Sequence, residues 1–252
     1  HVKDLNPDHL NFETISKLQN ADLSNLPELS SNERIGSCIT SPRKFIAIGL
    51  NYSDHAAEVG ADIPKEPIVF MKATSCIVGP NDDVEIVSGS KKLDWEVELG
   101  IVIGKEAKHI AENQSQDHIL GYCLVNDVSE REWQLEKMGQ WVKGKSHDTY
   151  GPVGPHLVTK DEISDVNNLK MSLDVNGKRM QTGNTSTMIF NVDVIVSYLS
   201  KYMTLLPGDI ITTGTPPGVG MGMKPQQFLK AGDMMKLSVE NLGEQNSKVV
   251  AL

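Results

Sequence analysis

Two glutamates inside an apolar run are the residues whose spacing first suggests chemistry. The run covers residues 94–99, and Glu96 and Glu98 stand two positions apart within it. Residues i and i+2 of a strand point to the same face, so the two carboxylates would lie side by side. Like charges on one strand face repel, and a hard cation such as Mg2+ would remove the repulsion by binding their oxygens. A solvated strand face that carries two glutamates fits the pattern equally well.

A third carboxylate, Asp127, ends an apolar run that predicts a buried strand over 119–127. It could supply the third oxygen ligand of a metal site. It could also be the N-cap of a helix, because 129–134 is typical of a helix start and Asp is a preferred cap. Taken alone, the segment favours the cap.

His55 and Glu58 are spaced i and i+3 in a short predicted helix that Ser53 or Asp54 would cap. This spacing puts both side chains on one helix face, where the carboxylate can orient the imidazole. For such a pair on a helix, an exposed and weak charge interaction is the commoner outcome.

Residues 139–146 match the phosphate-loop pattern G-x-x-x-x-G-K-S letter for letter. Phosphate binding by this loop needs a buried strand before it and a helix after it, whose amides cradle the phosphates. The preceding segment is charged and helical in pattern, and 147–155 is too rich in glycine and proline to open a helix. We therefore reject nucleotide binding. Lys145 remains either a cation in a cleft or a solvated surface lysine.

The elements that must position these residues are mainly strands. Segments 82–87 and 94–103 would form a hairpin that turns at Gly89, and 171–175 and 178–181 a second one around Asn176-Gly177. The glycine-rich loop 214–222 would line a cleft or serve as a plain connection. Further strands are expected over 44–50, 69–72, 119–127, 210–213 and 233–252, and helices over 107–116 and 189–202.

At 252 residues the chain can form one large domain with an appendage. Residues 1–41 are rich in Asn, Ser, Leu and Pro and predict a small N-terminal appendage. It contains a helical pattern at Phe12, Ile15 and Leu18, followed by a loop through Pro27. Residues 42–252 form the predicted catalytic domain.

Composition limits the partners. The formal net charge of -9 and the pI near 5.3 argue against nucleic acids and anionic membranes, which bind concentrated Lys and Arg. No apolar run is long enough to span a bilayer, and no secretion signal is evident. Cys38, Cys76 and Cys123 are odd in number and widely spaced, which indicates reduced core residues. A cytoplasmic protein with small-molecule or protein partners is expected.

Five stretches taken together resemble the fumarylacetoacetate hydrolase family, and the likeness runs from about Phe45 to Val250. Each stretch alone is weak evidence, but their combination in this order and spacing is specific. It reverses several of the preferences stated above for non-functional interpretations. The stretches are Gly49-Leu50-Asn51-Tyr52 with His55 and Glu58, Asp94-Trp95-Glu96-Val97-Glu98-Leu99, Asn126-Asp127-Val128-Ser129-Glu130-Arg131 with Gln134, Lys143-Gly144-Lys145-Ser146 and Thr213-Gly214-Thr215-Pro216.

The resemblance implies a fold, a cofactor and an assembly. The fold would be α+β and strand-rich, a mixed β-sandwich roll with a few short helices. The cofactor would be Mg2+ or Mn2+ on Glu96, Glu98 and Asp127, without an organic cofactor. The assembly would be a homodimer.

The activity implied by the resemblance is a metal-dependent hydrolase of acylpyruvate-like or 2,4-diketo acids, which cleaves a C–C bond through a metal-stabilised pyruvate enolate. His55, oriented by Glu58, would activate water. Lys145 and Gln134 would stabilise the developing oxyanion and hold the metal-side oxygens. Thr215 would contact the substrate carboxylate, and Arg131 would bind substrate or be structural.

The resemblance leaves other activities open, because its members are functionally mixed. An oxaloacetate decarboxylase, or a lyase or isomerase of a related 2-oxo or hydroxy acid, including a ureidoglycolate lyase, is the main alternative. A non-catalytic metal-binding domain is a remote one. Groups on the far side of the substrate are expected from residues 60–67, 184–187 and 221–223.

Overall fold

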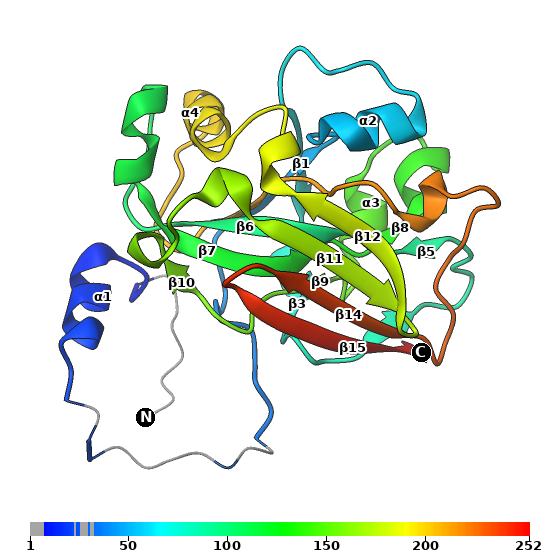
Figure 1. The fold of residues 1–252 in the computed structure, drawn as a ribbon, viewed down its shortest axis with the longest axis horizontal. Coiled ribbons are helices and arrows are strands. Elements are labelled where there is room, and N and C mark those ends of the chain that lie inside the picture. The colour runs from blue at the N-terminus through cyan, green and yellow to red at the C-terminus, as the bar shows by residue number, and fades with distance from the viewer. Residues whose placement is uncertain (1–7, 23, 26–29, 31–32) are drawn as a thin grey trace.

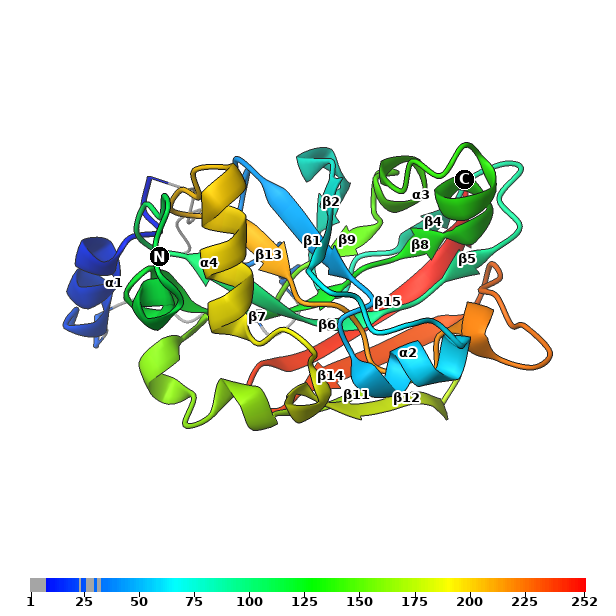
Figure 2. The same cartoon turned by 90° about the horizontal axis from the view of Figure 1, so that it is seen from above.

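Strands form most of the computed structural model, which describes residues 8–22, 24–25, 30 and 33–252. The described part is α+β and strand-rich, as predicted. One sheet has the order β10-β7-β6-β13-β1-β2 and the other β12-β11-β14-β15-β4 (Figures 1 and 2). The first comprises β1 (Phe45–Gly49), β2 (Ile68–Lys72), β6 (Val97–Ile103), β7 (Ile119–Asn126), β10 (Val158–Thr159) and β13 (Ile210–Thr212). The second comprises β4 (Val84–Ile86), β11 (Lys170–Val175), β12 (Lys178–Asn184), β14 (Met234–Val239) and β15 (Gly243–Ala251).

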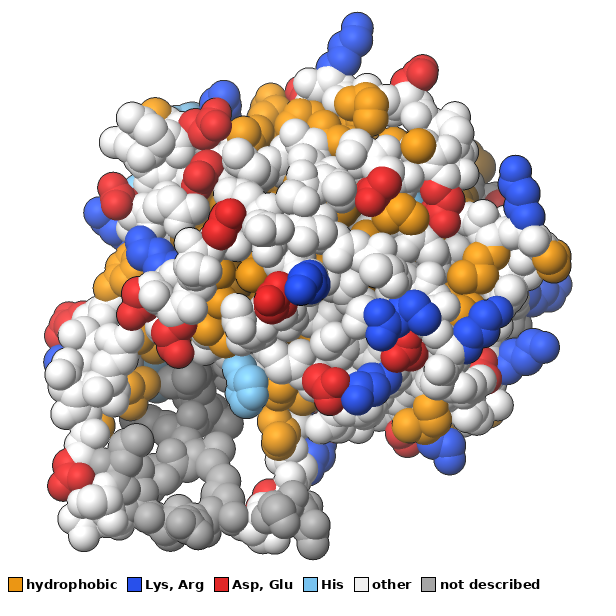
Figure 3. Space-filling view, in the orientation of Figure 1, with side chains coloured by type: hydrophobic (Ala, Val, Ile, Leu, Met, Phe, Trp, Pro, Cys, Tyr) orange, Lys and Arg blue, Asp and Glu red, His pale blue; other side chains and the backbone are white. Residues whose placement is uncertain are grey.

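The two sheets pack on each other, with β6 and β7 against β11, β14 and β15. Every residue of β6 and β7 is buried. These strands lie between the second sheet and the helices on the upper side of Figure 1, which include α4 (Val192–Tyr202). β14 instead alternates, and Met235, Leu237 and Val239 face the core. Such alternation is expected of an antiparallel sheet with one wet face. Basic and acidic side chains are interspersed on the face drawn in Figure 3.

Short elements complete the fold. Helices α2 (Ser53–Val59) and α4 (Val192–Tyr202) cover the upper side of the molecule in Figure 1, and Figure 2 shows them from above. The remaining pieces are α1 (Phe12–Gln19), α3 (Val142–Lys145), a π-helix (Glu132–Glu136), the strand pairs β3 (Ile77–Val78) with β9 (Gly151–Pro152) and β5 (Leu93–Asp94) with β8 (Ser129–Glu130), and 3-10 turns at Thr74–Cys76, Glu112–Asp117, Lys160–Glu162, Val166–Asn168, Thr185–Thr187 and Gly220–Gly222. None of the described helices is long and apolar enough to cross a membrane.

The N-terminal segment keeps its predicted helix. Asn11 caps α1 by accepting the Thr14 N–H, and Leu10 is fully buried in the core. The predicted loop around Pro27 lies partly outside the described residues. The three cysteines are free, as predicted, with Cys76 and Cys123 buried.

The predicted hairpin of 82–87 with 94–103 is wrong. β4 pairs in parallel with β15, with Val84 opposite Val249, whereas β6 lies between β7 and β13. A strand buried on both faces can have neighbours on both edges, and sequence proximity did not decide which strands they are. The hairpin around Asn176-Gly177 is confirmed, and both turn residues have the positive φ that a type I′ turn requires.

The helix predicted over 107–116 is also largely wrong. Only Glu112–Asp117 is helical, as a 3-10 turn. The backbone N–H groups of Ala107 and His109 donate instead to the carbonyls of Leu205 and Ser200, each at 2.9 Å. These bonds to a distant segment of the same chain satisfy the backbone N–H groups that a helix would have paired internally.

Candidate active site

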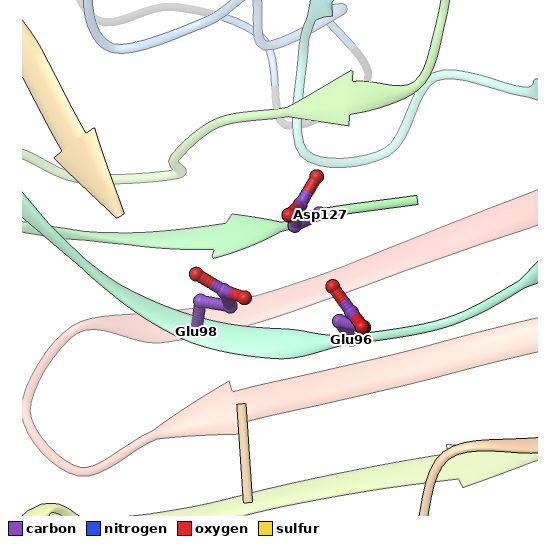
Figure 4. A group of neighbouring side chains, drawn as sticks. All are labelled: Glu96, Glu98 and Asp127. Carbon is purple, nitrogen blue, oxygen red and sulfur yellow. The ribbon is translucent and has the colours of Figure 1, made fainter. Parts of the chain in front are cut away.

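Three buried carboxylates converge where β6 begins and β7 ends. Val97 pairs with Asn126 across the two strands, so Glu96 and Asp127 flank the same end of the ladder. One carboxylate oxygen from each of Glu96, Glu98 and Asp127 lies within 4.8 Å of the others, and all three residues are buried. Figure 4 shows the three side chains directed toward a common space. The predicted same-side placement of Glu96 and Glu98 is therefore present, and the exposed strand face is excluded.

Two buried lysines contact this triad. Lys145 Nζ lies 2.6 Å from Glu96 Oε2 and 2.6 Å from Asp127 Oδ2, and Lys72 Nζ lies 2.5 Å from Asp127 Oδ1. Lys72 also donates to the backbone carbonyl of Lys145. Lys145 is thus a buried cation and not a surface lysine. The Asp127 cap is wrong as well, because its carboxylate is taken by lysines and Ser129–Glu130 is a strand.

The carboxylates differ in charge balance. Burial alone would raise the pKa of Glu96, but Arg131 and Lys145 hold that pKa well below its usual range. Burial raises the pKa of Glu98 well above its usual range, and the nearby charges of Asp127 and Glu96 add to the rise. Glu98 accepts the uncharged Gly214 N–H at 2.9 Å and forms no ion pair with the described residues. A divalent cation would supply the positive charge that this carboxylate lacks, and three carboxylate oxygens suit Mg2+ or Mn2+.

Arg131 fixes the position of one triad member. Its Nε donates to Asp94 Oδ2 at 2.9 Å, one terminal nitrogen donates to Glu96 Oε1 at 2.7 Å, and the other donates to Gln134 Oε1 at 3.0 Å. All three nitrogens are therefore engaged within the protein. The geometry supports the structural role for Arg131 that the sequence left open beside substrate binding.

His55 and Glu58 form the predicted pair on α2. His55 Nδ1 lies 2.9 Å from Glu58 Oε2, and both side chains are largely buried, which excludes the exposed pair. The other Glu58 oxygen, Oε1, accepts the Gly218 N–H at 2.9 Å. The predicted cap is wrong, because Tyr52 occupies the N-cap position and no side chain caps the helix. Asp54 instead accepts the His55 N–H and the Thr187 hydroxyl.

A cavity of about 210 Å3 joins these groups. Every predicted site residue except Glu58 lines it, and Glu58 reaches it through His55. The glycine-rich loop contributes Gly214, Thr215 and Met221, so that loop does line a cleft. Three segments were expected to contact the far side of the substrate. Segment 221–223 lines the cavity through Met221, but 60–67 and 184–187 do not, so this prediction is mostly wrong. The apolar wall comes instead from Ile48, Leu50, Val59, Ile68, Phe70, Leu135 and Trp141.

The Thr215 hydroxyl is occupied within the protein. It donates to the Val97 carbonyl at 2.9 Å and accepts from Gln181 Nε2 at 2.8 Å. A hydroxyl has one proton to donate, so a substrate carboxylate could receive it only if the bond to Val97 were broken.

The rejection of the phosphate loop is confirmed. Residues 142–145 form the single turn α3, and the chain then continues to β9 without a following helix. Lys145 points at carboxylates, which is the opposite of a phosphate-binding role.

Three residues that position the site were not predicted from the sequence. Lys72 ends an apolar strand, and that lone charge in an apolar run was the available signal. Asp94 accepts the Gly220 and Met221 N–H groups at 2.7 and 3.0 Å, which anchors the glycine-rich loop. Gln181 accepts the Val97 N–H and also bonds to the loop. Neither partner is near Gln181 in sequence, so no local pattern could reveal it.

Comparisons with known proteins agree on one family. Residues 44–250 match the model described as the fumarylacetoacetate hydrolase C-terminal domain. A Burkholderia lata protein provisionally named a hydrolase is 57% identical over 246 residues, which cover 97% of this chain and 87% of the relative.

Two solved structures have names that differ in reaction. A fumarylacetoacetate hydrolase from Exiguobacterium antarcticum has a TM-score of 0.85 and 38% identity, covering 92% of this chain and 84% of that one. A 2-hydroxyhepta-2,4-diene-1,7-dioate isomerase from Mycobacterium marinum has a TM-score of 0.76 and 38% identity, covering 86% and 78%. The neighbours therefore support an enzyme and leave its reaction class undecided.

Proposed function

The chain belongs to the fumarylacetoacetate hydrolase family, and we propose that it is a metal-dependent hydrolase that cleaves a C–C bond in acylpyruvate-like or 2,4-diketo acids. The observation that carries the proposal is the His55 and Glu58 pair on the same cavity as the carboxylate triad. A hydrolase needs a group that activates water, and a metal site alone would not supply an oriented imidazole.

Glu96, Glu98 and Asp127 would hold Mg2+ or Mn2+, without an organic cofactor. When bound, the ion would supply Lewis-acid chemistry toward the oxygens of a 2-oxo acid. This agrees with the unbalanced charge of Glu98 and with the burial of all three carboxylates.

The reaction balances as one water plus R–CO–CH2–CO–COO⁻, giving R–COOH and pyruvate. Because Nδ1 of His55 faces Glu58, its Nε2 is the nitrogen left to take a proton from water. The resulting hydroxide attacks the carbonyl carbon next to R. The bond from that carbon to the CH2 group then breaks, the electron pair passes to the pyruvate half, and the proton held on Nε2 can return to the CH2 carbon.

The remaining polar groups hold the substrate and its developing charge. Lys145 would stabilise the oxyanion through a charge-assisted hydrogen bond in a buried site, where such bonds are strong. Gln134 lines the same cavity and would bind a substrate oxygen through its amide. Arg131 would act mainly by holding Glu96 and Gln134, and Thr215 would bring its backbone to the substrate carboxylate.

An isomerase acting on a related 2-oxo or hydroxy acid is the second candidate. The name of the Mycobacterium marinum neighbour favours it. An isomerase moves a proton and a double bond without releasing a fragment, so the two candidates differ in their products.

A turnover screen tests the proposal. The substrates are acetylpyruvate, oxaloacetate, a sugar-derived 2,4-diketo acid, ureidoglycolate and an unsaturated hydroxy dioate, each with Mg2+ or Mn2+. The proposal expects pyruvate from the diketo acids and a large loss in His55→Ala. Pyruvate from oxaloacetate alone supports a decarboxylase, and an absorbance change without fragments supports the isomerase. Light scattering tests the homodimer that we also propose.

A further inference from the structure

The lining of the cavity has a polar part and an apolar part. The polar part of the lining includes Glu96, Glu98, Asp127, Lys145 and Arg131, and the apolar part includes Ile68, Phe70, Leu135 and Trp141. This apolar wall lies directly beside the polar part, because Lys145 Nζ is 5.1 Å from the centre of the Phe70 ring. A substrate bound through its oxo-acid oxygens would therefore extend its other end along Phe70.

Trp141 bounds this apolar wall. Its ring meets the Phe70 ring edge to face, with 5.2 Å between the centroids. A Cβ at Gly49 would lie 2.5 Å from Trp141 Cζ3, so the glycine is what allows the indole to sit against the end of β1. Ile68 and Leu135 continue the wall to the surface, 37% and 41% exposed.

The cations on the cavity are already engaged. Among the described lining residues, the permanently charged cations are Arg131 and Lys145. Arg131 bonds to Asp94, Glu96 and Gln134, and Lys145 bonds to Glu96 and Asp127. All three nitrogens of Arg131 are engaged, and the third proton of Lys145 Nζ is the one proposed to hold the oxyanion, so neither residue is left to pair with a second substrate carboxylate at the apolar wall. Burial of an unpaired carboxylate is strongly unfavourable.

Resting on the proposed function, we propose that the wall formed by Ile68, Phe70, Leu135 and Trp141 selects a monocarboxylic diketo acid with an uncharged tail. Substrates with a carboxylate at the far end are discriminated against. The chemistry of this chain thus differs from that implied by the dioate in the name of its isomerase neighbour.

The test compares two acylpyruvates of equal size. In one the tail R is –CH2CH2CH(CH3)2, and in the other the branched end is a carboxylate, –CH2CH2COO⁻. We expect kcat/KM to be about tenfold or more higher for the neutral tail, since a hydrophobic pocket rejects an unpaired charge. Equal values, or a preference for the charged tail, overturn the inference. Acetylpyruvate serves as the reference: absence of pyruvate from all three substrates refutes the proposed function instead.

A charge placed on the wall gives a second readout. Leu135→Arg should move the charged-to-neutral ratio of kcat/KM about fivefold or more toward the charged tail, because the new cation can pair with it. Leu135→Gln controls for the loss of the apolar group. Met138→Arg adds the same charge at a residue that is 91% exposed and outside the cavity lining. An equal shift in Leu135→Arg and Met138→Arg contradicts placement of the tail on this wall.

Discussion

The Nδ1 atom of His55 lies 2.9 Å from Oε2 of Glu58, and the other oxygen of the same carboxylate accepts the Gly218 N–H. Glu58 therefore sets the orientation of the imidazole and at the same time joins α2 to the glycine-rich loop. The proposed base is held by two elements that are about 160 residues apart in sequence.

Glu58→Gln tests this orientation. The amide keeps the size of the side chain but removes the negative charge that favours the imidazolium formed during proton transfer. We expect kcat to fall by about 10- to 100-fold, less than the roughly 100- to 10,000-fold attributed to general-base catalysis itself, because His55 is still present. Initial rates of pyruvate release measure it. Glu66→Gln, which changes an exposed glutamate bonded to Tyr198, is the control and should keep the wild-type rate.

Metal binding should stabilise the fold. A ligand that binds only the native state at about 100 times its Kd adds roughly 2.7 kcal/mol. For a chain of this size we expect Tm to rise by about 5 to 10 °C when Mg2+ or Mn2+ replaces EDTA. Thermal melting measures the shift.

Glu98→Gln should abolish most of that shift, because it removes a triad carboxylate that forms no ion pair in the part of the chain that the structure describes. Glu244→Gln alters an exposed ion pair with Lys236 and should retain it. Equal shifts in both variants would place the metal elsewhere.

Lys72→Met tests the buried lysine. The change leaves one oxygen of Asp127 without its cation in a fully buried position. Breaking a buried pair costs about 3 to 5 kcal/mol, whereas an exposed pair contributes about 1 kcal/mol or less. Urea unfolding should show this contrast between Lys72→Met and Lys17→Met, since Lys17 pairs with Glu13 on the exposed face of α1. Similar losses in the two variants would argue against the role of Lys72.

The buried thiol of Cys76 should make the folded protein less stable at alkaline pH. Burial raises the pKa of its thiol from 9.0 to about 11. Below pH 9 the thiol is protonated in both states. Between pH 9 and 11 the unfolded chain loses its proton first, so the free energy of unfolding falls as pH rises, by about 2 to 3 kcal/mol. The stability of Cys76→Ala, measured by urea unfolding, should fall less steeply over this interval. Parallel curves would exclude the effect.

Local patterns in the sequence predicted the fold class and the side-chain pairs of the candidate site better than they predicted which strands pair. The spacing of Glu96 and Glu98, and of His55 and Glu58, translates directly into shared faces of a strand and a helix. Strand pairing is different, because β4 finds β15 at the other end of the chain and nothing in residues 82–87 encodes that choice. The two competing predictions for Asp127 show the same limit. The capping prediction is wrong because the Asp127 carboxylate accepts hydrogen bonds from Lys72 and Lys145, which lie in other segments of the chain.

The apolar wall of the cavity could not be predicted from local sequence patterns either. Trp141 lies in a segment that matched a phosphate loop, and Leu135 lies in one that read as a charged helix. The packing of Trp141 against Gly49 and Phe70 places its ring on the cavity wall that Leu135 also lines.

Hydrolysis in water enriched in 18O tests the central claim most directly. Acetylpyruvate, the metal-loaded protein and labelled water are combined, and the released acetate is examined by mass spectrometry. The proposal predicts one 18O atom per acetate, formed together with an equal amount of pyruvate, and a rate at least about 100-fold lower in His55→Ala. Absence of cleavage, or labelled acetate formed by His55→Ala at the wild-type rate, would contradict it.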